Sequence, residues 1–127
     1  MTFKELYDSA VKYVNPRQIN ENVSVNSVAC ALETKDSNVY YGVGHEIKYG
    51  LGMTAVQAAV AAMITNGETV IDKIVLVGEN GKVVVPTGIG RELILELDAA
   101  NNDTEVLLSL EPLKMARFKN LLPLRNN

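Results

Sequence analysis

The sequence predicts a single α/β domain over residues 1–127, with helices covering both faces of a mixed sheet in three layers, α/β/α. Three observations favour this fold. The chain is long enough for one hydrophobic core and leaves little room for a second. Hydrophobic residues make up 47% and charged residues 21%, which is typical of a globular protein. Short β-branched runs alternate with helical patterns, which indicates a sheet of about five strands between helices.

The N-terminal segment predicts a helix followed by a hairpin. Thr2-Phe3-Lys4-Glu5 forms a capping-box pattern, and apolar residues then recur at helical spacing until Asn15-Pro16. A polar loop follows. The runs 27–32 and 39–43 have the composition of strands, and the turn residues at 35–38 between them complete a predicted hairpin.

The middle of the chain predicts a buried helix and a second hairpin. Residues 54–66 are rich in alanine, valine, methionine and isoleucine, and Gly67 stands where a helix commonly ends. The β-branched run 74–77 predicts a strand. Asn80-Gly81 favours a tight turn into a further strand over 83–85.

The C-terminal third begins with a glycine-rich junction, Pro86-Thr87-Gly88-Ile89-Gly90-Arg91. It leads into a helical pattern over 92–97 that ends at Asn101-Asn102. Residues 104–110 predict a strand. Pro112 then suggests the first turn of a last helix, whose apolar residues would be Leu113, Met115, Phe118 and Leu121.

Charge and composition disfavour several classes of function. The net charge is −3, and lysine and arginine are scattered singly, so the sequence shows no basic stripe for nucleic acid. No run is long enough to span a bilayer, and the start has no basic segment followed by an apolar one. We therefore expect a cytoplasmic protein without nucleic-acid or membrane partners. The single cysteine, Cys30, lies in an apolar run and is interpreted as a buried, inert thiol.

Two predicted helix starts could carry chemistry, one at Thr54 and one near Thr87. Unpaired backbone N–H groups and the helix dipole favour an anion or a polar ligand group there. A threonine at such a position also caps a helix, and that structural role is the alternative for both residues.

Four motifs lie around these helix starts: Gly44-His45-Glu46, Tyr49-Gly50-Leu51, Thr54-Ala55-Val56 and the junction 86–91. Together they resemble the cytidine deaminase family that acts on free nucleosides. The similarity extends over nearly the whole chain, including Val28–Leu32, Leu93–Leu97 and Leu121-Leu122-Pro123. The resemblance implies a cytidine deaminase-like fold and a homo-oligomer, a dimer or a tetramer.

The chemistry of that family needs a zinc ion held by a histidine or cysteine and two further cysteines, with a nearby glutamate that moves protons. Here Thr54 stands at the first ligand, Val56 at the glutamate, and Thr87 and Gly90 at the two cysteines. The chain contains one cysteine and one histidine, so it cannot supply three nitrogen or sulfur ligands. The sequence therefore predicts no metal, no cofactor and no zinc-dependent deamination.

The ribose-binding positions of the family are also altered. Glu46 matches the glutamate that holds the ribose hydroxyls, but Gly44 falls at the asparagine. Asn26 stands where many relatives carry an aromatic residue. Recognition of nucleosides in the family's manner is therefore weakened.

The remaining candidates have two interpretations each. Gly88 and Gly90 serve a tight turn or approach a ligand phosphate. Arg91 binds an anion or pairs with a surface glutamate. His45 and Glu46 could perform acid–base chemistry, but neighbouring strand residues face opposite sides, so at most one should point into a pocket.

Three hypotheses of function follow. The leading one is a non-catalytic homologue of cytidine deaminase that binds a nucleoside, a nucleotide or another small molecule, or acts as a regulatory protein. Its degenerate pocket would comprise Glu46, Thr54, Thr87, Gly88, Gly90 and Arg91, with His45 as a weaker candidate. The second is an enzyme whose site acts without zinc on a small anionic or nucleoside-like substrate. The third is a structural domain for self-association or for binding a partner.

Overall fold

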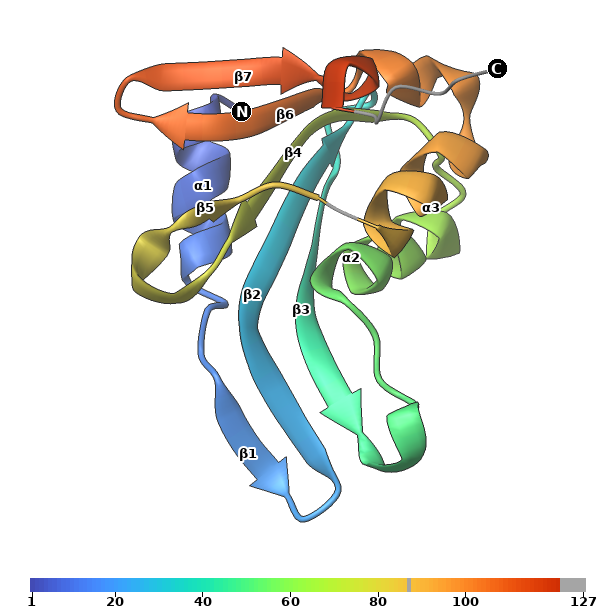
Figure 1. Ribbon diagram of the computed structural model, residues 1–127. Helices are drawn as coiled ribbons and strands as arrows, with labels where there is room; N and C mark the ends of the chain where they lie inside the picture. The colour runs from blue at the N-terminus through green and yellow to red at the C-terminus, as the bar shows by residue number, and fades with distance from the viewer. Residues whose placement is uncertain (87, 122–127) are drawn as a thin grey trace.

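The computed structural model describes residues 1–86 and 88–121, which form a mixed sheet between two helical layers (Figure 1). The helices are α1 (Phe3–Val11), α2 (Ala55–Thr65) and α3 (Ile89–Leu97), with short 3-10 turns at Lys48–Gly50, Glu79–Gly81, Ala99–Asp103 and Phe118–Leu121. The strands are β1 (Arg17–Asn20), β2 (Val23–Thr34), β3 (Val39–Ile47), β4 (Ile71–Val77), β5 (Val83–Val84), β6 (Glu105–Leu110) and β7 (Leu113–Arg117). None of the helices in this part of the chain is long and apolar enough to cross a membrane.

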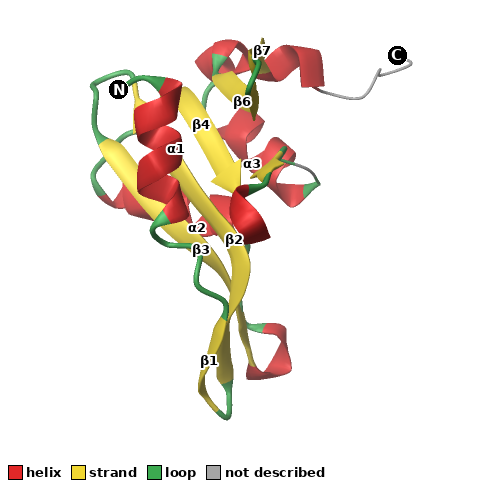
Figure 2. Ribbon diagram, turned by 90° about the vertical axis from the view of Figure 1, so that its left-hand side faces the viewer, coloured by secondary structure: helices red, strands yellow, loops and turns green. Residues whose placement is uncertain are grey.

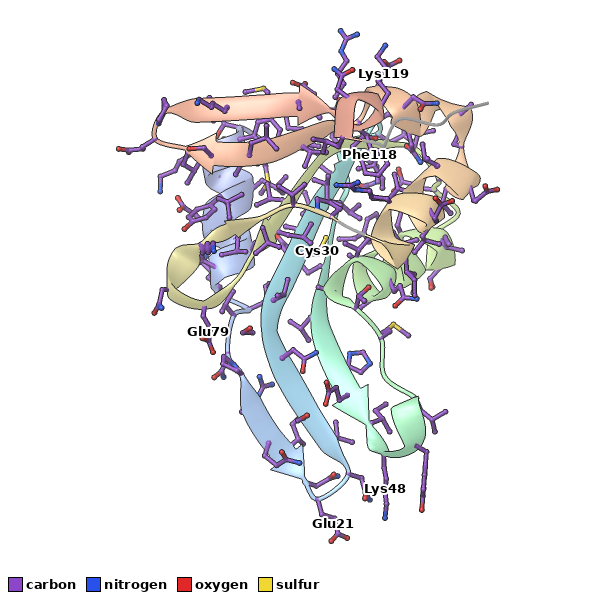
Figure 3. All side chains as sticks on the ribbon, in the orientation of Figure 1. Glu21, Cys30, Lys48, Glu79, Phe118 and Lys119 are labelled. Atoms are coloured by element: carbon purple, nitrogen blue, oxygen red, sulfur yellow. The ribbon has the colours of Figure 1, made fainter. Side chains whose placement is uncertain are left out.

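The sheet is built around the long strand β2, which pairs antiparallel with β1, β3 and β4. Strand β6 runs parallel to β4, and β7 closes the far edge antiparallel to β6. This confirms the predicted mixed sheet. Beyond the helices, β1, β2 and β3 continue as an arm, with Glu21 and Lys48 at its tip (Figure 3).

Helices cover both faces of the sheet, as the sequence predicts (Figures 1 and 2). On one face α1 packs Phe3, Leu6 and Ala10 against buried residues of β2, β4 and β6. On the other face α2 and α3 pack against the opposite side of the same strands. The buried residues of this second layer include Cys30, Leu32, Val56, Ala59, Val60, Met63, Ile74, Leu76 and Ile94.

The described chain has seven strands where the sequence suggests about five, because two strands were missed. All four residues of β1 are exposed, so the strand has no alternating apolar pattern that would reveal it. The other is β7, over residues for which the sequence predicts a helix beginning at Pro112. Leu113 and Met115 are spaced by two, which also fits a strand, and pairing with β6 satisfies backbone groups that would otherwise form an open edge.

The first helix ends at Val11, four residues before the predicted stop at Asn15-Pro16. The apolar residues beyond it contact the sheet from a loop instead. The Tyr13 ring lies 4.8 Å from the Tyr41 ring, centroid to centroid, and Val14 packs against the core beneath α1. Tertiary contacts therefore explain apolar spacing that resembled a longer helix.

Helix α2 lies unusually close to β3, at Gly42. A Cβ atom on this glycine would lie 2.6 Å from the carbonyl oxygen of Ala55 and 2.7 Å from Cβ of Ala58, and it would overlap the backbone nitrogen of Ala59. Only glycine allows this approach. The contact fixes the start of α2 against the strand that carries His45 and Glu46.

Cys30 is fully buried in β2, as expected from its apolar run (Figure 3). Burial raises the pKa of its thiol far above the ordinary value, because the surroundings disfavour a thiolate. The prediction of a buried, inert cysteine is confirmed.

Candidate functional site

The start of α2 is held by a reciprocal capping box. The backbone N–H of Gln57 donates to the Thr54 hydroxyl oxygen at 3.2 Å, and the backbone N–H of Thr54 donates to the Gln57 side-chain oxygen at 2.9 Å. The predicted cap is confirmed. One lone pair of the Thr54 hydroxyl oxygen is therefore used by the helix backbone.

The second helix start lies directly beside the first. Gly88 has a φ of 52°, in the region that favours glycine, and precedes α3. Gly90 is buried, and a Cβ placed on it would lie 3.5 Å from Cγ2 of Val56. Val56 itself is only 3% exposed. The two helix starts thus meet through an apolar contact, while Thr87, predicted as the second cap, lies outside the described residues.

Arg91 holds the loop that joins β5 to α3. Its Nε donates to the carbonyl oxygen of Pro86 at 2.8 Å, and its backbone N–H donates to the carbonyl of Gly88 at 3.1 Å. These bonds close the loop on itself. The sequence proposed an anion or a surface glutamate as the partner of Arg91 and did not foresee this internal bond.

An open groove of about 470 Å³ runs along the start of α2. One wall is the edge of β3, where His45 and Met53 exchange backbone hydrogen bonds of 3.0 and 3.1 Å. The residues around the groove are Asn26, His45, Glu46, Ile47, Gly50, Gly52, Met53, Thr54, Gln57 and Ile89.

His45 and Glu46 both line the groove, although strand alternation led us to expect only one of them there. The reason is that Met53, in the segment after β3, pairs with His45 at the edge of that strand. The groove follows this edge, so residues from either face of β3 reach it. His45 Nδ1 lies 3.0 Å from the carbonyl oxygen of Val43, and Glu46 is exposed. The described residues around this groove include no serine, cysteine or lysine that the pair could activate.

A second pocket, of about 230 Å³, lies on the other side of Asn26 and Thr54, which line both hollows. Its walls come from β2, β3, α2, β4, β5 and the loop before α3. They are formed by Val28, Gly44, Ala55, Val56, Leu76, Val84, Val85 and Pro86. None of these valines, nor Leu76, belongs to the pocket predicted from the sequence, which places Val56 only at the position of the family's glutamate. A β-branched run predicts a strand but not which hollow its side chains face.

Of the seven residues that the sequence singled out, the structure brings Glu46, His45 and Thr54 to the groove. Gly88, Gly90 and Arg91 form the neighbouring helix start. Among residues 1–86 and 88–121, no three histidine, cysteine, aspartate or glutamate side chains are grouped to hold a metal ion.

The order of the strands, and the meeting of two helix starts beside β3, define the class: this is the cytidine deaminase-like α/β/α fold. Solved structures of cytidine deaminases share it across their length. The enzyme from Mycobacterium leprae is 21% identical, with a TM-score of 0.75 over 98% of this chain and 99% of that chain. The enzyme from Mycobacterium tuberculosis is 22% identical, with a TM-score of 0.77 over 97% and 95%.

Cytidine deaminase from Burkholderia pseudomallei is 25% identical, with a TM-score of 0.74 over 97% of this chain and 98% of that chain. No protein-family model matches the chain, and no curated protein matches its sequence. Similarity at these identities establishes the fold, and function is inferred from the residues of the site.

Proposed function

We propose that this protein is a non-catalytic relative of the cytidine deaminases, which binds a small molecule, such as a nucleoside or nucleotide, or serves a regulatory role through such binding. The observation that carries the proposal is the contact between Val56 and Gly90. The resemblance assigns the proton-moving glutamate to the first position and a zinc-binding cysteine to the second. An apolar side chain packed on a glycine supplies neither a proton carrier nor a metal ligand.

The described residues at the resemblance's zinc positions do not fit a zinc ion. Val56 and Gly90 have no side-chain donor atoms, and the Thr54 hydroxyl accepts the N–H of Gln57. A catalytic zinc site takes three protein ligands, chiefly histidine nitrogen, cysteine sulfur or carboxylate oxygen. This mismatch supports a binding role in place of metal-assisted deamination.

The two hollows beside α2 support a retained capacity to bind. They share Asn26 and Thr54 as lining residues. Their walls include Thr54 at the start of α2 and Ile89 at the start of α3. Concave sites with a few convergent polar groups are where small ligands bind in most proteins.

A metal analysis combined with a cytidine turnover assay tests the loss of catalysis. We expect purified protein incubated with zinc and then desalted to retain less than stoichiometric zinc and to produce no uridine. Stoichiometric zinc with turnover would overturn the proposal.

Thermal shift tests the retained pocket. A ligand at 100 times its dissociation constant adds about 2.7 kcal/mol, which raises the midpoint of a domain of this size by several degrees. The screen would contain nucleosides, nucleotides, free bases, phosphate and small carboxylates. If none of these produced a shift, the binding proposal would fail.

The presence of both His45 and Glu46 in the groove favours a second candidate, an enzyme that acts without zinc on a small anionic or nucleoside-like substrate. An imidazole beside a carboxylate can move protons. If a screen detects an activity, the Glu46→Gln variant should lose it while its unfolding midpoint stays unchanged. Full activity in that variant would remove this candidate.

Exposed apolar residues around the groove favour self-association as a further role. Tyr49 is 86% exposed, Leu51 69% and Ile89 63%. We propose a homo-oligomer, a dimer or a tetramer, in which a second copy covers them. Sedimentation equilibrium would show the oligomer, and Leu51→Glu with Ile89→Glu should shift it toward monomer. A monomeric wild-type protein would contradict this role.

A further inference from the structure

The pocket of about 230 Å³ beside the start of α2 is mostly apolar. Most of its walls are apolar, with Val28, Val56, Leu76, Val84 and Pro86 facing it from five different parts of the chain. None of the described residues that line it carries a charge. The surface hollow next to the turn at 36–38, in contrast, is lined by Asp36 and Glu68.

Two of the described side chains that line the pocket are polar, and both belong to exposed residues. The Thr54 hydroxyl accepts the N–H of Gln57 in the helix cap. The Asn26 amide has no hydrogen bond to any other described residue, and its nitrogen faces Gly44 across the pocket wall, 3.3 Å from where a Cβ on that glycine would lie. A side-chain amide both donates and accepts hydrogen bonds. Among the described residues, the exposed Asn26 therefore offers one adaptable polar contact beside the apolar walls.

We propose that this pocket selects an uncharged ligand with a compact apolar body, a single ring or a branched chain, and one carbonyl, amide or hydroxyl group that meets Asn26. The inference rests on the proposed binding function and names its ligand class. A phosphate or carboxylate against these apolar walls would lose part of its hydration and find no counter-charge among the described lining residues, which is unfavourable. The pocket is also smaller than the roughly 300–1,000 Å³ that larger ligands fill, so one ring is the size it fits.

Methyl-resolved NMR with four probes tests the ligand class. Thymine and benzyl alcohol are the uncharged probes, and cytidine 5′-monophosphate and inorganic phosphate are the charged ones. We expect the uncharged probes to shift the methyl resonances of Val28, Val56 and Leu76 in a saturable way. The charged probes should leave those resonances unchanged at the same concentrations.

A matched pair of variants locates the binding. Val56→Thr replaces one methyl group of the pocket wall by a hydroxyl, and Val60→Thr makes the same change one turn along α2, at a buried residue that does not line the pocket. We expect the first variant to weaken binding of the uncharged probes about five- to tenfold, because the hydroxyl finds no partner there. The second should change it less than twofold.

The outcomes separate this inference from the function on which it rests. Saturable binding of the charged probes at these methyl groups, without the uncharged ones, would overturn the inference and keep the binding pocket. Equal weakening by both variants would show that the apolar wall does not contact the ligand, and would also overturn it. If no probe shifted these resonances, the inference would be overturned, whereas the binding function would fail only if the thermal-shift screen, which also tests ligands for the larger groove, gave no shift either.

Discussion

Replacing Asn101 with alanine should destabilise the fold strongly, because this side chain joins the end of α3 to β4 and to the loop that precedes β4. Asn101 is fully buried after α3. Its oxygen accepts the backbone N–H of Ile71 at 2.9 Å, and its nitrogen donates to the carbonyls of Thr69 and Ile94, each at 2.9 Å. Sequence reasoning assigned it only the end of a helix.

The expected loss follows from those three bonds. Each buried backbone group left without a partner costs about 1–3 kcal/mol, so we expect Asn101→Ala to lower the free energy of unfolding by about 3–5 kcal/mol. Asn102→Ala is the matched control. The Asn102 side chain makes one exposed hydrogen bond, to the carbonyl of Ala99, and its loss should cost less than about 1 kcal/mol.

Urea unfolding at 25 °C measures both variants, and their midpoints can be compared directly if the slopes agree. A difference of less than about 1 kcal/mol between Asn101→Ala and Asn102→Ala would contradict the anchoring role of Asn101. It would mean that water or a rearranged loop satisfies the freed groups around Ile71. A large difference would confirm that this side chain anchors the end of α3, and with it the helix that carries Gly90.

Three further predictions concern packing, pH and reactivity. Gly42→Ala should lower the free energy of unfolding in urea by about 1–3 kcal/mol or more, because the added Cβ overlaps the α2 backbone. Gly44→Ala on the same strand, where the nearest atom to the added Cβ lies at 3.3 Å, should lower it clearly less. Equal losses would contradict the close approach of α2 to β3. Hydrogen bonding to Thr34, and then to Tyr40 and Asn38, lowers the pKa of Glu68, so its carboxylate stabilises the fold above the unfolded-state pKa and loses that effect as the pH falls through the folded-state value. Wild type should therefore have a higher urea midpoint than Glu68→Gln at pH 7, and the gap should shrink below about pH 4.3; a gap that did not change with pH would argue against the carboxylate. Because its thiol is buried, Cys30 should react with a thiol reagent in native buffer only as fast as the protein unfolds, and at full rate in urea. Fast labelling of the native protein would show that β2 opens locally.

Local features of the site were predictable because they depend on residues within one helical turn. Thr54 and Gln57 lie three positions apart, and their side chains can satisfy each other's backbone N–H groups in any fold that forms α2. The glycine before α3 is similar, since a positive φ is a property of a single residue. These elements were placed correctly to within a few residues.

The walls of the pocket were not predictable in the same way. Val28, Leu76 and Val84 lie on β2, β4 and β5, and they face one hollow only because β4 pairs with both of the other strands in a particular register. A shift of one residue in that register would turn each side chain to the other face. The joint placement of His45 and Glu46 in the groove likewise depends on the bridge to Met53.

The α/β class, the helix caps at Thr2 and Thr54 and the scarcity of nitrogen and sulfur zinc ligands follow from the sequence alone, since one cysteine and one histidine cannot supply three such ligands in any fold. The strand β7, the packing of Val56 on Gly90 and the apolar pocket beside them depend on tertiary contacts. The two groups of features differ in how far apart along the chain the interacting residues lie. Composition and capping act through neighbouring residues, whereas strand edges, close helix approach and pockets arise from the pairing of segments far apart in the chain.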